Sequence, residues 1–351
     1  MHKARLLAGL MLFVLGSAAS AVEPTFTDRE TAAKAAALGQ SCTGLNFYWE
    51  IGDANGNFRS GNGPAGTQYS KVKATQSGYI ASAGKWLYGA YVLEKTGGVL
   101  DQNADKPFLN FTSPYHALRG CYGKTVGACG ADNNNPPTPG DLGKFYYESG
   151  HMQAHAAQDA TGLIGIKTLK AAQLGPVIAN TLHIANLKYG GPVLAGDAQL
   201  DTVNYASFLR QILNGTLKMK DALGTAAVCA SDDEGYGVNL KRYCGVDGLN
   251  VALYSPPQRN ADLNAGNPDT SPEWPADGER WQYSVGHWVE KDGTFSSGGA
   301  FGYYPWIDKS KQWYGILARY EFGNLLAYQK SIVCGRAIRN AWLLATPGAA
   351  P

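Results

Sequence analysis

The segment from Ser82 to Lys95 reads SAGKWLYGAYVLEK and is followed by Thr96-Gly97-Gly98. Its apolar residues recur at the spacing of one face of a helix, namely at Ala83, Trp86, Leu87, Ala90, Tyr91 and Leu93. Glycine ends helices readily because it adopts the left-handed conformation without steric cost. The sequence therefore predicts an amphipathic helix that begins at Ser82 and ends before Gly97.

Ser82 and Lys85 are the residues of this helix that could carry chemistry. Three residues apart, they lie on one helix face with β-carbons about 5–6 Å apart. A serine hydroxyl needs a neighbouring base to become a nucleophile, and a lysine in a partly buried pocket can lose its proton and act as that base. A Ser-x-x-Lys spacing alone arises by chance in many chains and usually indicates a solvated helix face, so other segments must decide.

The segments on either side of the helix indicate strands. Leu45 to Ile51 is rich in aromatic and branched residues, and Asn55-Gly56 leads into an extended stretch from Phe58, which predicts a hairpin. Beyond Tyr283, alternating segments broken by glycines predict two or three strands. We expect an α/β protein with an antiparallel sheet built from both ends of the chain, flanked by helices, with a mainly helical lobe over about residues 100–280.

Helices are expected in four further places. The first runs from Asp28 to Leu38, capped by Thr27 or Asp28, and others follow between His151 and Leu187 and over residues 204–213. A last helix begins at Glu321 or Asn324 and ends at Leu344. Residues 101–141 are rich in Pro, Asn and Gly without a sustained period, which predicts an irregular, disulfide-linked segment over the site.

The N-terminus has the pattern of a secretory signal. Basic residues precede an apolar run from Leu6 to Leu15, and small residues end at Ala19-Ser20-Ala21. The run is shorter than the roughly 20 residues that span a bilayer. We expect cleavage after Ala21 and an exported domain over residues 22–351, periplasmic or secreted, without a membrane span. With 30 basic and 28 acidic residues and no block of like charge, no nucleic-acid partner is expected.

Six cysteines in an exported chain favour three disulfides over a zinc site, because no Cys-x-x-Cys spacing is present. Of the fifteen possible pairings, we expect the one that closes two short loops and joins the chain ends. That pairing is Cys42–Cys334, Cys121–Cys129 and Cys229–Cys244.

Two motifs resemble those of a known family. Ser82-Ala83-Gly84-Lys85 at a helix start resembles the first motif of serine β-lactamases and penicillin-binding proteins. The stretch PGDLGKFYYESGH, residues 139–151, is similar to the Pro-Gly…Phe-x-Tyr-x-Asn region of the class C β-lactamase and esterase branch. The resemblance implies that Tyr147 occupies the catalytic tyrosine position and that Ser149 stands where the family usually has Asn.

A third motif, Ser297-Gly298-Gly299-Ala300-Phe301-Gly302, resembles the Lys-Thr-Gly, His-x-Gly or Trp-Gly-Gly strand motif, with Ser297 in the first position. Lys291-Asp292-Gly293 is a rival placement that keeps the basic residue. A fourth segment, residues 189–215, resembles the family's Gly-Gly turn and the helix after it. It carries no chemistry but extends the resemblance from about Leu45 to Tyr320.

The resemblance implies acyl transfer without a cofactor or metal. Ser82 would attack a carbonyl while Lys85 and Tyr147 share its proton, and the backbone N–H groups of Ser82 and Ala300 would hold the oxyanion. The residues that it implies for substrate contact are Ser149, Ser297, Gly298 and Gly299. We expect an ester or amide substrate, with an ester preferred because the family's Asn and Lys are replaced.

Two alternatives stay open. One is a D,D-peptidase or β-lactamase that acts on cell-wall peptides or β-lactams with the same residues. The other is a binding protein that retains the scaffold without turnover.

Histidines and aromatic residues offer other sites. His151 and His155, four apart, could bind zinc, but Met152 stands where a metalloprotease has Glu, so a polar helix face is expected. His287 and His116 are candidate bases of a Ser-His-Asp hydrolase, although the Gly-x-Ser-x-Gly elbow is missing. Several aromatic side chains could line a groove, but core packing is expected for most of them. Those next to the third motif are better groove candidates than the rest, and none is assigned to the site. The aromatic candidates are Trp86, Tyr88, Trp274, Trp281, Trp288 and, next to the motif, Tyr303, Tyr304 and Trp306.

Overall fold

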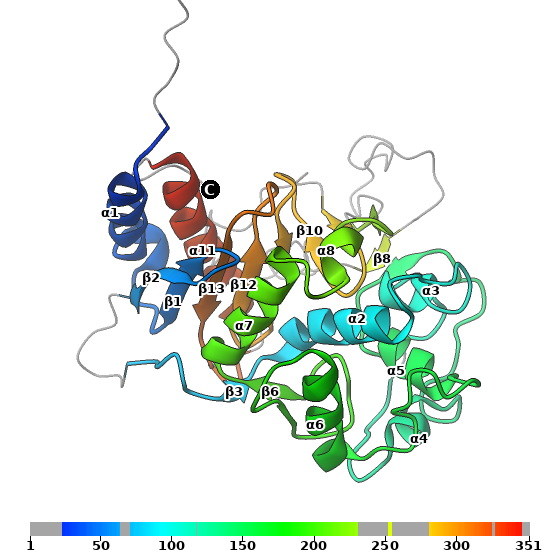
Figure 1. Ribbon diagram of the computed structural model, residues 1–351. Coiled ribbons are helices and arrows are strands. Elements are labelled where there is room, and N and C mark those ends of the chain that lie inside the picture. The colour runs from blue at the N-terminus through cyan, green and yellow to red at the C-terminus, as the bar shows by residue number, and fades with distance from the viewer. Residues whose placement is uncertain are drawn as a thin grey trace, which may run out of the picture.

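A central antiparallel sheet, built from strands of both ends of the chain, organises the molecule (Figure 1). The structure is a computed structural model that describes residues 23–63, 71–116, 118–230, 252–254, 281–324 and 327–345. The proposed signal, residues 1–21, lies outside these ranges. No helix among the described residues is both long and apolar enough to cross a membrane.

The main sheet has the strand order β2-β1-β13-β12-β11-β10-β9-β7. Its strands are β1 (Tyr48–Gly52), β2 (Asn57–Asn62), β7 (Val228–Cys229), β9 (Gln282–Tyr283), β10 (Trp288–Val289), β11 (Phe295–Ser296), β12 (Tyr304–Ile307) and β13 (Tyr314–Ala318). The predicted hairpin is β1–β2, and β1 pairs with β13 from Tyr48 opposite Ala318 to Gly52 opposite Tyr314. The expectation of an antiparallel sheet made from the two chain ends is therefore confirmed.

The C-terminal part of the sheet contains more and shorter strands than predicted. Glycines with positive φ interrupt it at Gly286 (72°), Gly293 (86°) and Gly302 (98°). Each turns the chain back sharply, so the two or three expected strands become the five from β9 to β13. Two small sheets complete the structure. They are β3 (Gly78–Tyr79) with β6 (Ala198–Leu200) and β5 (Lys188–Tyr189), and β4 (Phe145–Tyr146) parallel to β8 (Ala252–Tyr254).

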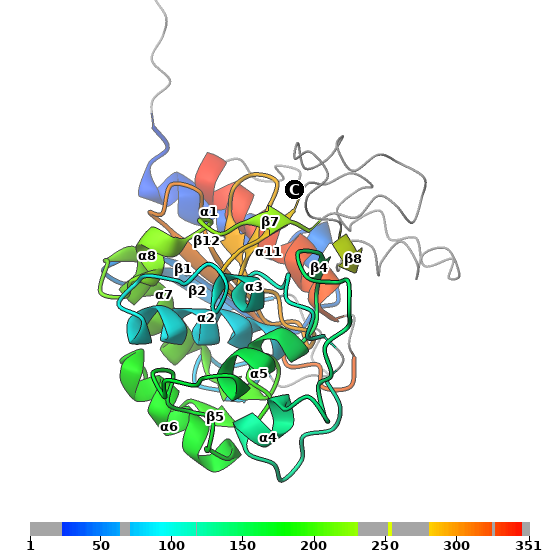
Figure 2. The same ribbon diagram turned by 90° about the vertical axis from the view of Figure 1, so that its right-hand side faces the viewer.

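Helices cover both faces of the main sheet. The described helices are α1 (Phe26–Ala37), α2 (Gly84–Lys95), α3 (Lys106–Leu109), α4 (Val126–Gly130), α5 (Gly150–Ala157), α6 (Ala171–Thr181), α7 (Thr202–Leu213), α8 (Met219–Ala222) and α11 (Ala327–Leu344), with 3₁₀ turns η1 (Gln40–Cys42) and η2 (Ala81–Ala83). The first and last helices, α1 and α11, lie side by side on one face, while α7 and α2 lie on the other (Figure 1). Beyond α2 are gathered α4, α5 and α6 (Figure 2).

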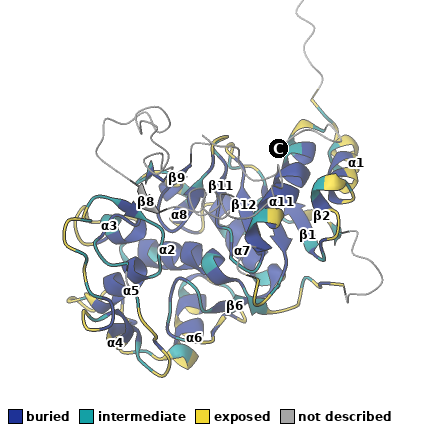
Figure 3. Ribbon diagram, turned by 180° about the vertical axis from the view of Figure 1, so that it is seen from behind, coloured by how far each residue is buried: buried dark blue, intermediate teal, exposed yellow. Residues whose placement is uncertain are grey.

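Helix α2 is buried on all sides rather than amphipathic as predicted. Every residue from Gly84 to Leu93 is buried, and Figure 3 shows the helix as a dark core between the sheet side and the outer helices. It ends as expected, with Gly97 and Gly98 at positive φ. A helix enclosed in this way holds the residues of its first turn rigidly.

Several helix boundaries differ from the predictions; α2 begins at Gly84 rather than at Ser82, which lies in η2. Helix α1 begins two residues early because Thr25, not Thr27 or Asp28, is its cap: the Thr25 side chain accepts from the Asp28 N–H, and the Asp28 carboxylate accepts from the Thr25 N–H. At the C-terminus, Glu321 begins a turn rather than a helix, and α11 is described from Ala327. Helical structure between His151 and Leu187 is divided into α5 and α6 by residues 158–170.

Two predicted disulfides are present, Cys42–Cys334 and Cys121–Cys129. The first joins η1 to α11 across 292 residues of sequence, which fixes the two chain ends to each other. Cys229 is also disulfide-bonded, and its expected partner Cys244 lies outside the described residues.

Candidate active site

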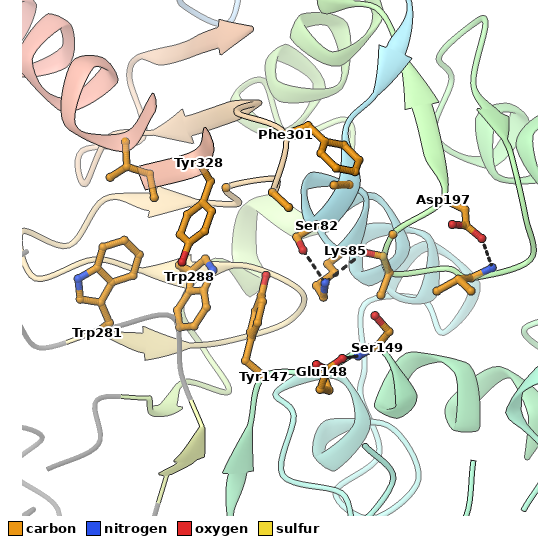
Figure 4. A pocket seen from close by; sticks show the side chains of 17 residues that line it. Ser82, Lys85, Tyr147, Glu148, Ser149, Asp197, Trp281, Trp288, Phe301 and Tyr328 are labelled. Atoms are coloured by element: carbon orange, nitrogen blue, oxygen red, sulfur yellow. Dashed lines mark hydrogen bonds between the residues drawn. The ribbon is translucent and has the colours of Figure 1, made fainter. Parts of the chain in front are cut away.

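Ser82 lies on a tight 3₁₀ turn at the entrance to α2. The preceding residue, Ala81, has a φ of 46°, a left-handed conformation that a non-glycine residue rarely adopts. Ala81 and Ala83 are buried on either side, whereas Ser82 is partly exposed. Such conformations cost of order 1–3 kcal/mol and occur preferentially at functional sites. The turn presents the Ser82 hydroxyl to a cavity (Figure 4).

Lys85 follows three residues later, in the first turn of α2, and is 3% exposed. Its Nζ donates to Ser82 Oγ at 2.8 Å and to the Ala195 carbonyl at 3.1 Å (Figure 4). Burial lowers the pKa of this amine to about 8, and the negative charge of Glu148 acts in the opposite direction. No carboxylate forms an ion pair with Lys85 within the part of the chain that is described. A neutral Lys85 is therefore accessible close to physiological pH.

Tyr147 faces the same pair from the link between β4 and α5. The Nζ of Lys85 lies 4.8 Å from the centre of its ring, and its hydroxyl points toward Ser82 (Figure 4). Burial raises the pKa of Tyr147 to about 12, although polar contacts with Ser82 and Trp288 act against this. The phenol consequently keeps its proton at neutral pH and is suited to donate it.

His151 holds the segment that carries Tyr147. Its Nε2 lies 2.8 Å from the Tyr146 carbonyl, and its Nδ1 lies 2.7 Å from Ser113 Oγ. Burial lowers the pKa of His151 to about 3, so the ring is neutral. The prediction that His151 and His155 lie on a polar helix face is wrong, because α5 is enclosed on all sides. His155 is also buried and contacts Tyr88 and Asp105.

The third motif approaches Ser82 from the sheet. It follows directly after β11, and Ser297 Oγ donates to the Ser82 carbonyl at 3.1 Å. A β-carbon on Gly299 would lie 2.0 Å from the Ile80 carbonyl oxygen, so only glycine permits this approach. Neither Ser82 nor Ala300 donates its backbone N–H to another described residue. Both donors flank the cavity and could bind an oxyanion.

The rival placement of this motif lies away from the cavity. Lys291 is exposed in the turn between β10 and β11, and Asp292 is bound to Arg339. Gly298 and Ala300 line the cavity. Ser297 is 1% exposed, and its hydrogen bond to the Ser82 carbonyl stabilises the turn that carries Ser82. A direct contact of Ser297 or Gly299 with substrate stays a prediction.

The cavity has a volume of 390 Å³, which is suited to a small molecule. Its lining combines the three motifs with residues from the 193–197 loop, the sheet and α11. These residues are Ala81, Ser82, Lys85, Tyr147, Glu148, Ser149, Val193, Ala195, Gly196, Asp197, Trp281, Trp288, Gly298, Ala300, Phe301, Tyr328 and Ile332. Ser149 lines the cavity together with Tyr147, and its contact with substrate stays a prediction.

Several lining residues were missed from the sequence. Tyr328 and Ile332 reach the cavity from α11, and no local pattern connects them to Ser82, which is more than 240 residues away. The fourth segment was expected to carry no chemistry, yet its Ala195 carbonyl binds Lys85. None of the described residues of the 101–141 segment lines the cavity. It packs behind Tyr147 through Phe111, at 5.6 Å between ring centres, rather than over the cavity.

All the aromatic candidates that the structure describes belong to the core, and two of them also line the cavity. Trp281 and Trp288 line the cavity. The other described candidates are buried in the core, as was expected of most of them: Trp86, Tyr88, Tyr303, Tyr304 and Trp306. The three beside the third motif lie in or next to β12, a central strand of the sheet. Trp274 lies outside the described residues.

The alternative histidine bases do not reach Ser82. His287 is buried against Trp86, and its ring nitrogens bind the Val285 carbonyl and the Gly224 N–H. His116 binds Asp141. No cluster of metal-binding side chains occurs among the residues that the structure covers.

Comparison with known proteins gives a fold but no sequence family. No protein-family model matches the chain, and no curated protein sequence does so. Three solved structures are similar: a Bacteroides dorei protein assigned as a beta-lactamase (16% identity, 84% of this chain and 93% of that one, TM-score 0.52), FmtA from Staphylococcus aureus (14%, 88% and 86%, 0.52) and simvastatin synthase LovD from Aspergillus terreus (13%, 89% and 97%, 0.50).

Identities this low establish similarity of fold alone. The sheet order, the flanking helices and the position of Ser82 at the start of a buried helix agree with the expected architecture. The chain therefore has the α/β fold of the β-lactamase-like and penicillin-binding-protein-like serine hydrolases.

Proposed function

We propose that the protein is a serine hydrolase that cleaves an ester or amide bond through an acyl-enzyme on Ser82, with an ester preferred. The observation that carries the proposal is the hydrogen bond of 2.8 Å between the Ser82 hydroxyl and the buried amine of Lys85. A binding protein has no physical need for a desolvated lysine beside a serine on a strained turn. Catalysis does, because the serine must lose a proton as it attacks.

In the proposed reaction Lys85 acts as the base and Tyr147 as the acid. Neutral Lys85 accepts the proton of Ser82 Oγ as Oγ bonds to the substrate carbonyl carbon, and the N–H groups of Ser82 and Ala300 stabilise the oxyanion. Tyr147 then donates its proton to the leaving oxygen or nitrogen as that bond breaks, and Lys85 returns a proton to Tyr147. In the second half, neutral Lys85 accepts a proton from water as the water oxygen bonds to the acyl carbon. Lys85 then returns that proton to Ser82 Oγ as the bond to Ser82 breaks and the acid leaves.

We further propose export, with removal of residues 1–21. The pattern of this segment and the disulfides Cys42–Cys334 and Cys121–Cys129 support an oxidising location outside the cytoplasm. Residues 22–351 would then form one domain.

Labelling with a fluorophosphonate, read by intact-mass spectrometry of the purified mature protein, tests the function. We expect one adduct, mapped to Ser82 and absent from Ser82→Ala. Labelling should slow strongly in Lys85→Met but not in Lys95→Met, a matched change at the far end of the same helix. An unlabelled protein, or an adduct on another serine, would contradict the proposal. The same spectrum shows whether the mature chain begins at Val22.

A further inference from the structure

One wall of the cavity is aromatic and apolar and adjoins Tyr147. It is formed by Trp281, Trp288, Tyr328 and Ile332, whose exposed fractions are 2%, 3%, 9% and 4%. Figure 4 shows Trp281, Trp288 and Tyr328 grouped on one side of Ser82, with Asp197 on the other side. We call these four residues the aromatic wall. Rings in such a wall favour a flat, apolar group over a hydrated one.

The position of Tyr147 indicates which part of the substrate meets this wall. In the proposed reaction Tyr147 protonates the leaving atom, so the leaving group lies on the Tyr147 side of Ser82. The Tyr147 and Trp288 rings are 4.7 Å apart between centres and tilted by 31°. A leaving group that receives its proton from Tyr147 is therefore brought against Trp288 and the rest of the aromatic wall.

The charges of the cavity indicate that this group is not anionic. Lys85 is the sole basic side chain among the described lining residues, and it is bound to Ser82 and Ala195, whereas Glu148 and Asp197 are acidic. Arg336 lies 5.2 Å from the Trp281 ring, but it is outside the lining and its Nε donates to Glu290 at 2.9 Å. Within the described part of the cavity, a carboxylate would therefore be desolvated without a cation to pair with it.

We propose, building on the hydrolase function above, that the substrates are esters of an uncharged aromatic alcohol or phenol, released against the aromatic wall. Substrates with a carboxylate on the leaving side, as in peptides with a free C-terminus, are disfavoured. The enzyme would then select its substrates by their leaving group, and α11 would contribute to this selection through Tyr328 and Ile332.

Three acetate esters of similar leaving-group acidity test this assignment. Methyl 4-acetoxybenzoate has a neutral aromatic leaving group, 4-acetoxybenzoate adds a carboxylate, and hexafluoroisopropyl acetate has no ring. For the wild-type mature protein, we expect kcat/KM for the neutral aryl ester to exceed that for each of the others by about tenfold or more. Active sites are counted by fluorophosphonate titration, so that misfolded protein does not enter the comparison.

Variants on α11 connect the preference to the wall. Ile332→Ala should lower kcat/KM for the neutral aryl ester several-fold more than it lowers kcat/KM for hexafluoroisopropyl acetate. Ile332→Lys should raise the ratio of the carboxylate ester to the neutral one. The control is Ile338→Ala: Ile338 is in the same helix, is 3% exposed and does not line the cavity, so it reports loss of packing alone.

The outcomes separate this inference from the proposed function. Equal kcat/KM for the neutral aryl and ring-free esters, or a preference for the carboxylate ester, would overturn this inference. The proposed hydrolase function would still stand in that case if the fluorophosphonate labelled Ser82. The same effect of Ile338→Ala and Ile332→Ala would also overturn it. Absence of both labelling and turnover would remove the proposed function and this inference together.

Discussion

Two buried sites in this protein differ in the partners of their ionisable group, which are neutral at one site and oppositely charged at the other. At the first, Lys85 is 3% exposed and its hydrogen-bond partners are a hydroxyl and a carbonyl, both neutral. At the second, Glu290 is also 3% exposed but accepts from Arg336 Nε at 2.9 Å and from Arg339 Nη2 at 3.0 Å. We call this second group, which joins β10 to α11, the Glu290 cluster.

The pKa values follow from the partners. Burial alone would raise the pKa of Glu290, but the positive charges of Arg336 and Arg339 outweigh it and lower the value to about 2. Burial of Lys85 acts with little opposition and lowers its pKa to about 8. The Glu290 cluster keeps its charges at any physiological pH, as a structural contact requires. Lys85 can exchange its proton near neutrality, as a base requires.

The largest effect is expected when Lys85 loses its amine. Lys85→Met keeps the length of the side chain but removes the base, so the rate of acylation by methyl 4-acetoxybenzoate should fall by about 10²- to 10⁴-fold. The thermal midpoint should stay the same or rise, because a desolvated amine with neutral partners is removed. Rates and scanning calorimetry of Lys85→Met and Lys95→Met measure both. A large loss of stability in Lys85→Met would show that this amine is structural.

The Glu290 cluster should give the reverse result. Glu290→Gln leaves two buried guanidinium groups without their shared carboxylate, and we expect the free energy of unfolding to fall by about 3–5 kcal/mol. The rate per folded molecule should hardly change. Denaturant unfolding with fluorophosphonate titration separates the two quantities. As a control, Glu30→Gln removes the surface pairs with Lys34 and Arg59 and should change stability far less. Equal effects of both variants would remove the contrast.

The smallest effect concerns pH. If neutral Lys85 is the base, the labelling rate of Ser82 rises with pH through about 8 and then levels. The negative charge of Glu148 raises the pKa of Lys85, so Glu148→Gln should move the midpoint to lower pH by a fraction of a unit. Asp197→Asn, a change in another carboxylate of the same cavity, should leave the midpoint in place. A shift to higher pH in Glu148→Gln would be inconsistent with Lys85 as the base.

Local patterns predicted much of the fold because the relevant forces act over a few residues. The β1–β2 hairpin was signalled by Asn55-Gly56, and the end of α2 by Gly97-Gly98. The helix start at Thr25 was missed because Thr25, Thr27 and Asp28 are all good caps and the choice among them depends on reciprocal hydrogen bonds. The pairing Cys42–Cys334 was selected from the spacing of the other cysteines rather than from any contact.

The sequence by itself determined the candidate reactive pair, because Ser82 and Lys85 lie three residues apart and a helical turn over them brings their side chains together. It also determined that strands from both chain ends form one sheet. Only the tertiary structure decided that α2 is buried on all sides, which lowers the pKa of Lys85 and turns a surface pattern into a candidate base. It likewise brought Trp288 and the residues of α11 to Ser82, since their contacts span more than 200 residues and depend on how the sheet packs.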